Sequence, residues 1–111
     1  MKKLFKCSMC NFVFEGDDAP DFCPKCGAPK EKFVALSDEE IGKVVNSART
    51  NSIHMELMRA ADKITALCKE GIAINLDPPC VDLFGKALKE AYLIRNRSSA
   101  ELEGHMKKGK W

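Results

Sequence analysis

The sequence predicts a small metal-bound β-and-turn unit followed by an all-α helical hairpin. Four of the six cysteines fall near the amino terminus as two Cys-x-x-Cys pairs, and apolar residues recur at helical spacing over the rest of the chain. The segment Asp77-Pro78-Pro79 divides that helical region into two parts. We therefore expect a metal-binding domain at residues 1–36 and a helical hairpin region at residues 37–111.

Residues 1–36 are too few to bury a sufficient core of their own. Their apolar mass comes from a handful of scattered Phe and Val side chains. Below about 40 residues, a fold usually needs a metal or disulfides. We expect a bound metal to contribute most of the folding free energy of this unit, and the unit to unfold without it.

The helical region opens with a capping box. In Ser37-Asp38-Glu39-Glu40, the Ser37 hydroxyl can accept from an amide of the first turn while the Glu40 carboxylate reaches back. The apolar periodicity then predicts a helix that continues to Glu70, with Thr50-Asn51-Ser52 as a plausible kink and Gly71 as the residue that ends it.

A second helix is predicted to begin after Asp77 and to run to about Gly104 or slightly past it. Both helices carry apolar stripes too broad for one hairpin to cover. The residues that define these stripes are Ile53, Leu57, Ile64, Leu67, Val81, Phe84, Leu88 and Ala91. We therefore expect a homodimer through residues 37–111 that closes into a four-helix bundle.

The charge balance excludes some classes of partner. The chain has 18 basic and 16 acidic side chains and a net charge of +2, so it has no broad positive field for nucleic acid. No stretch approaches the roughly 18 apolar residues of a membrane span, and the amino terminus lacks the apolar run of a signal peptide. We expect a cytoplasmic protein without nucleic-acid or membrane partners.

The paired cysteines predict a four-thiolate metal site. Cys7 and Cys10 are separated by two residues, as are Cys23 and Cys26, and twelve residues lie between the pairs. Two such turns facing each other close a tetrahedron of sulfur. A reducing compartment favours metal binding over disulfides, and four thiolates select zinc or iron without deciding between them.

The sequence around these cysteines resembles the rubredoxin-like domain of rubrerythrins. The resemblance covers Cys7–Gly16 and Ala19–Phe33, including Ala19-Pro20, Cys23-Pro24 and Pro29-Lys30. It implies one iron per chain, held by the four cysteines, which relays single electrons to a redox partner protein that the sequence does not identify. By the same resemblance the chain is an electron carrier rather than an enzyme, in an oxidative-stress or peroxide-reducing system.

Two departures from the family pattern stand out. Asn11 occupies a position where the family commonly has Gly; that position often needs a left-handed backbone, which Asn tolerates better than most residues. The metal-binding unit also comes first, as in the reverse arrangement, whereas in most rubrerythrins it follows a di-iron helical bundle.

Two alternative functions stay open at this point. The first is a zinc-ribbon-like structural or interaction protein. The second is a rubrerythrin-like di-iron peroxidase formed by dimerisation, although the Glu-x-x-His motif is missing and the nearest substitutes are Glu101 and His105. We interpret this pair as the surface of a helix end, and Cys68 and Cys80 as buried, inert thiols.

Overall fold

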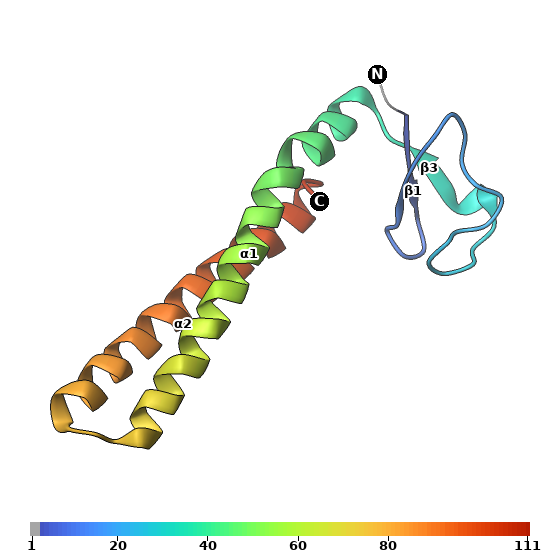
Figure 1. Cartoon of the computed structure of the whole chain (residues 1–111). Coiled ribbons are helices and arrows are strands. Elements are labelled where there is room, and N and C mark those ends of the chain that lie inside the picture. The colour runs from blue at the N-terminus through green and yellow to red at the C-terminus, as the bar shows by residue number, and fades with distance from the viewer. Residues whose placement is uncertain (1–2) are drawn as a thin grey trace. The chain divides into compact units, whose positions relative to one another are not determined.

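The structure is a computed structural model that describes residues 3–111. Its elements are strands β1 (Leu4–Cys7) and β2 (Val13–Glu15), the short helix η1 (Lys30–Lys32), strand β3 (Phe33–Ala35) and helices α1 (Asp38–Ile74) and α2 (Pro78–Lys107) (Figure 1). The predicted fold class is confirmed. One compact unit extends to Val45 and the other spans Asn46–Trp111, so the division falls within α1. The predicted boundary after residue 36 stays a prediction.

The amino-terminal unit is built on a three-stranded antiparallel sheet with β1 in the centre. Phe5 of β1 lies opposite Phe14 of β2 and also opposite Ala35 of β3. Up to Val45, the described residues with buried side chains are Leu4, Cys7, Cys23 and Ile41. Two of these four are cysteines, so the interior of this unit is largely its sulfur cluster.

The capping box at the start of α1 is confirmed. The Ser37 amide donates to Glu40 Oε1 at 2.9 Å, and the Glu40 amide donates to Ser37 Oγ at 3.2 Å. Helix α1 then continues without a break through Thr50-Asn51-Ser52, where a kink had been considered plausible. Asn51 is buried, and its side chain donates to the Lys110 carbonyl of the carboxyl-terminal segment. The side chain therefore does not compete for the backbone hydrogen bonds of the helix.

The prediction that Gly71 ends the first helix is wrong. Helix α1 runs on to Ile74, and the left-handed residue after it is Asn75, with φ of 51°. Gly71 is needed inside the helix because the ring of Phe84 lies against it; a Cβ there would come within 2.5 Å of that ring. Helix α2 begins as predicted, with Asp77 accepting from the Cys80 amide, and ends at Lys107, slightly past Gly104 as expected.

Helices α1 and α2 lie side by side as an antiparallel hairpin (Figure 1). The less exposed positions recur at alternating spacings of four and three residues, the pattern of a coiled-coil seam. On α1 they are Ser47, Asn51, His54, Met58, Ala61, Thr65, Cys68 and Ile72; on α2 they include Val81, Phe84, Leu88, Ala91, Ser98, Leu102 and His105. The seam is apolar near the connection, small in the middle and polar at the open end.

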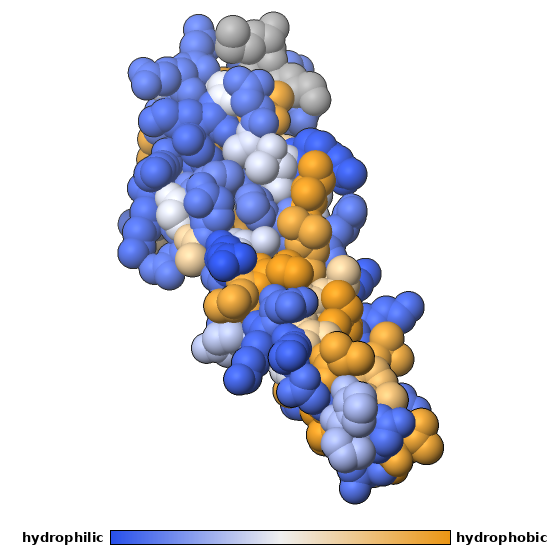
Figure 2. Space-filling view, turned by 90° about the vertical axis from the view of Figure 1, so that its left-hand side faces the viewer, coloured by the Kyte–Doolittle hydropathy of each residue, from blue (hydrophilic) through white to orange (hydrophobic). Residues whose placement is uncertain are grey.

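Many large apolar side chains of the hairpin remain exposed. Figure 2 shows apolar residues gathered along the helices. Of the residues that defined the predicted stripes, Ala91 is buried, whereas Ile53, Leu57, Ile64 and Leu67 are exposed. No helix within residues 3–111 is long and apolar enough to cross a membrane.

Candidate metal centre

The two Cys-x-x-Cys segments fold into equivalent turns. In the first, the Asn11 amide donates to the Cys7 carbonyl; in the second, the Gly27 amide donates to the Cys23 carbonyl. Asn11 and Gly27 both adopt the left-handed conformation, with φ of 67° and 76°. The conformation expected for Asn11 is therefore confirmed. Asparagine adopts here the left-handed conformation that glycine adopts in the matching turn.

The four sulfur atoms form one compact cluster. The Cys7 and Cys26 Sγ atoms are 3.7 Å apart, those of Cys10 and Cys23 are 3.5 Å apart, and all four lie within 4.8 Å of one another. A tetrahedron with sulfur–metal bonds of about 2.3 Å has edges of roughly 3.8 Å. The geometry therefore fits a tetrahedral metal ion, and all four cysteines are free thiols rather than disulfides.

The electrostatics of the cluster also suit a cation. At Cys23 burial acts to raise the pKa, but the amides of Cys26 and Lys25 donate to the sulfur and bring the pKa down to about 6. At Cys10 burial, together with the neighbouring sulfur atoms, raises the pKa to about 12. Four thiols this close cannot all ionise without a compensating positive charge, which a metal ion would supply.

The cluster has a buried side and an exposed side. Cys7 and Cys23 are buried, Cys10 is half-buried and Cys26 is exposed. Beside the cysteines, Met9 and Phe22 expose 65% and 68% of their surface. Phe22 therefore does not pack in the interior of the unit.

An ion pair ties the acidic loop between the two turns to helix η1. Lys30 Nζ lies 2.5 Å from Asp18 Oδ2, and this bond lowers the pKa of the Asp18 carboxyl. Asp17 and Asp21 of the same loop are also exposed. The acidic side chains of this loop are therefore solvated, and its ion pair is a surface pair.

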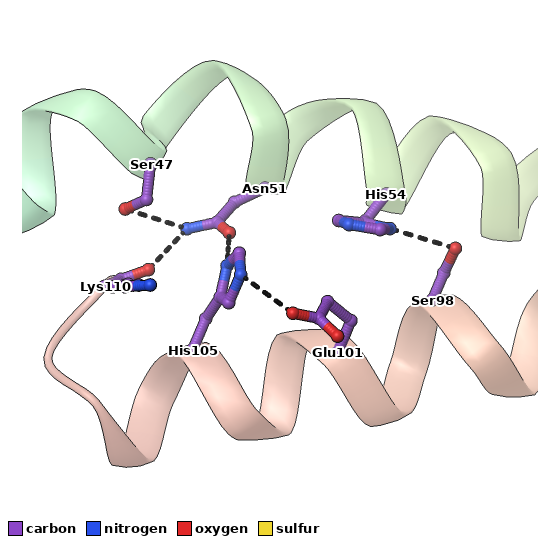
Figure 3. Close-up of polar contacts among 7 residues, drawn as sticks. All are labelled: Ser47, Asn51, His54, Ser98, Glu101, His105 and Lys110. Atoms are coloured by element: carbon purple, nitrogen blue, oxygen red, sulfur yellow. Dashed lines mark hydrogen bonds and ion pairs between the residues drawn. The ribbon is translucent and has the colours of Figure 1, made fainter.

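A second group of polar side chains lies at the open end of the hairpin (Figure 3). Asn51 Nδ2 donates to the Lys110 carbonyl at 2.7 Å, so its Oδ1 faces His105 Nδ1, 2.5 Å away. His105 Nε2 lies 3.3 Å from Glu101, and His54 Nδ1 lies 3.0 Å from Ser98 Oγ. His105 is thus part of the packing seam, which corrects its interpretation as helix-end decoration.

These polar side chains do not assemble a second metal site. Within residues 3–111, the four cysteines form the one group of three or more metal-ligating side chains close enough to share an ion. Glu56, Glu90 and Glu101 are exposed. Sequence reasoning missed Ser47, Asn51 and Ser98, although the four-and-three spacing of Ser47, Asn51 and His54 could have indicated a polar seam.

The remaining cysteines differ from each other. Cys68 is buried in the seam, as predicted. Cys80 is half-buried in the first turn of α2, and its pKa is raised by the hydrogen bond to Asp77 and by burial. The prediction of a buried thiol therefore holds for Cys68 and only in part for Cys80.

Comparison with known proteins agrees with the geometry of the cysteine cluster. Residues 5–34 match the protein family described as rubrerythrin, rubredoxin-like domain. The chain is 55% identical over 40 residues to reverse rubrerythrin-1 of Clostridium acetobutylicum, which covers 36% of this chain and 22% of that protein. It is 44% identical over 36 residues to rubrerythrin-1 of the same organism, covering 32% and 18%.

These similarities concern one part of the molecule. The matched segment spans about a fifth of the length of the curated relatives. No solved structure matches the chain. Residues 5–34 thus carry a rubredoxin-like domain of the rubrerythrin type, which points to an iron-binding redox protein.

Proposed function

We propose that this chain is a cytoplasmic one-electron carrier that holds one iron ion at Cys7, Cys10, Cys23 and Cys26. The observation that carries the proposal is the compact cluster of four free thiols inside a segment that matches the rubrerythrin rubredoxin-like domain. A bound iron ion would supply a reversible change between the ferric and ferrous states. Reduced thiols are maintained in the cytoplasm.

The protein contributes charge compensation and a route for the electron. Backbone amides that donate to Cys10 and Cys23 would offset the negative charge of four thiolates. The buried Cys7 and Cys23 exclude water on one side, whereas the exposed Cys26 brings a ligand sulfur to the surface. A redox partner protein would dock at this exposed side, beside Met9 and Phe22.

Metal analysis and visible spectroscopy of protein purified from its native host test this proposal. We expect one iron per chain, a red ferric tetrathiolate that bleaches on addition of one electron equivalent, and full recovery on reoxidation. A colourless protein with one zinc per chain would contradict the proposal and would favour a structural zinc site, because the same four thiolates suit zinc. Zinc found only after heterologous expression does not count against it.

We also propose that the chain forms a homodimer through residues 37–111. The support is the exposed apolar surface of the hairpin, in which Ile53, Leu57, Ile64 and Leu67 each expose 39% or more. At about 25 cal/mol per Å², leaving such side chains in water forgoes several kcal/mol. Sedimentation velocity at micromolar concentration tests this point, and a monomer of 12.3 kDa would contradict it.

A further inference from the structure

Helix α1 carries a second apolar strip beside the seam that packs on α2. Its members are Ile53, Leu57, Ala60, Ile64 and Leu67, spaced by four, three, four and three residues. All five are exposed, and each lies one position before a residue of the seam. An apolar strip with this heptad spacing fits another helix of similar length.

Exposed charged side chains of alternating sign border this face of the hairpin. On α1 the row is Arg49, Glu56, Lys63 and Glu70, at intervals of seven; on α2 it is Lys86, Glu90, Arg97 and Glu101. Positions that precede the seam on two antiparallel helices lie on the same side of the pair. Within residues 3–111, Lys63, Glu70, Glu90 and Arg97 form no ion pair. Arg49, Glu56 and Lys86 form exposed pairs, and Glu101 pairs with the largely buried His105.

In each row, two charges at equal distances on either side of the centre have opposite signs. The centres of the two rows lie at the same height along the hairpin. The row on α1 is centred between residues 59 and 60, and the row on α2 between residues 93 and 94. His54 lies opposite Ser98, and Gly71 lies opposite Phe84. Interpolation between these two contacts brings the two centres to one level, so a single two-fold axis could pass through both.

We propose that this face binds a second copy of the chain in antiparallel orientation. A two-fold axis perpendicular to the helices at that level places Glu56 against the partner's Lys63, and Glu90 against the partner's Arg97. It also places Arg49 against the partner's Glu70, and Lys86 against the partner's Glu101. The apolar strips of the two copies meet between these charges. The inference rests on the homodimer proposed above and adds its interface and orientation.

A parallel pair of hairpins also matches these charges. With the two connections at the same end, α1 faces the partner's α2, so that Glu56 meets Arg97 and Lys63 meets Glu90. The outer charges pair as well, Arg49 with Glu101 and Glu70 with Lys86. The two arrangements differ in their apolar contacts. The antiparallel pair joins the apolar strip of α1 to the same strip of the partner, whereas the parallel pair places it against the face of α2 that carries Glu90, Arg97 and Glu101. For this reason we favour the antiparallel arrangement.

A charge swap separates the two orientations. In the full-length, metal-loaded protein, Glu56→Lys should raise the dimer Kd about tenfold, because two symmetric attractions become repulsions. The double variant Glu56→Lys/Lys63→Glu should restore it, since the antiparallel pair again joins opposite charges. Glu103→Lys is the matched control: Glu103 and Glu56 have equally exposed side chains, but Glu103 follows the seam and so lies on the other side. Its Kd should not change.

Zero-length cross-linking with a carbodiimide gives an independent readout. A mixture of 14N- and 15N-labelled protein identifies by mass spectrometry the peptides joined between two chains. We expect Glu56 joined to the partner's Lys63, and Glu101 joined to the partner's Lys86. Links between Lys63 and the partner's Glu90 would instead mark the parallel pair.

The outcomes distinguish this inference from the proposals on which it rests. A dimer that the double swap weakens further, or one with Lys63–Glu90 links, overturns the antiparallel interface and leaves the homodimer in place. A dimer indifferent to Glu56→Lys overturns it in the same way. A monomer at all concentrations up to about 100 μM overturns both, while the iron content and reversible one-electron reduction report separately on the redox proposal.

Discussion

The two units of this chain achieve a stable fold by opposite means. In the unit that ends at Val45, two of the four buried side chains are thiols, so a bound metal ion would take the place of much of a hydrophobic core. In the unit Asn46–Trp111 no three metal-ligating side chains lie close together, and its helices meet through small and polar side chains such as Ala61, Ala91 and Asn51. The comparison suggests a division of roles within one chain, with metal binding proposed for the first unit and dimerisation proposed for the second.

Removing one thiolate should break the comparison most severely. Cys23→Ser is expected to abolish tight metal binding and to unfold the amino-terminal unit, because structural four-ligand sites contribute on the order of 10 kcal/mol. The helical signal in circular dichroism should largely remain. Cys68→Ser, outside the cluster, serves as the control and should keep its metal. Full metal content together with a folded amino-terminal unit in Cys23→Ser would refute the four-thiolate assignment.

A pair of glycine substitutions tests the other unit. Gly71→Ala should destabilise the hairpin by about 1–3 kcal/mol, because the new Cβ would meet the ring of Phe84. Gly85→Ala is the matched control: it is also helical, but no atom lies within 4 Å of its new Cβ. It should stabilise the hairpin by about 0.5–1 kcal/mol. Denaturant unfolding followed at 222 nm measures both, and equal signs would contradict the packing described for Phe84.

The equivalent turns around the cysteines predict a smaller effect. Asn11→Ala should cost about 1 kcal/mol, because alanine adopts the left-handed conformation less readily than asparagine. Asn11→Gly should be close to neutral, since glycine gains freedom at this position and loses some on folding. The measurement is the midpoint of metal release in a chelator titration. Equal midpoints for the two variants would show that this backbone conformation is not important.

The smallest expected effect concerns the start of α1 and its pH dependence. The Ser37 amide donates to Glu40 and holds the pKa of that carboxyl below its ordinary value of 4.5. Because the pKa is lower in the folded state, the ionised Glu40 stabilises the fold above pH 4.5. This stabilisation is lost as the pH falls through the pKa of the folded state. Glu40→Gln should cost about 0.5–1 kcal/mol at neutral pH, because it keeps an acceptor for the Ser37 amide but removes the negative charge from the first turn of the helix. Its difference from the unmodified protein should shrink below pH 4, where Glu40 itself becomes neutral, as thermal unfolding at several pH values would show.

Local signals in the sequence predicted much of this structure. The positions of the cysteines, the capping box at Ser37 and the N-cap at Asp77 depend on a few neighbouring residues, and all lie where they were expected. The conformation of Asn11 followed from the turn in which it lies. Such features are set by short-range chemistry, so sequence reasoning reaches them.

Features that depend on packing between helices were harder to predict. Gly71 has the composition of a helix end, but the ring of Phe84, far away in the sequence, keeps it inside α1. The large apolar residues suggested the hairpin contact, yet Ile53 and Leu57 are exposed while Ser47 and Asn51 fill the seam. Periodicity shows that a helix has apolar stripes, but it does not say which stripe meets which neighbour.

The polar end of the seam fixes the alignment of the two helices. In the apolar part, near the connection, the contact of the Phe84 ring with Gly71 also favours one alignment. The bonds of Asn51 to His105 and to the Lys110 carbonyl, and of His54 to Ser98, exist in one alignment alone. Sliding would strand these buried donors and acceptors, at about 1–3 kcal/mol each. Such a slip would also carry the charges of α2 out of level with those of α1. A few hydrogen bonds at the open end therefore help to select the register of the two helices. The charge pattern of the face proposed to bind a second copy depends on this register.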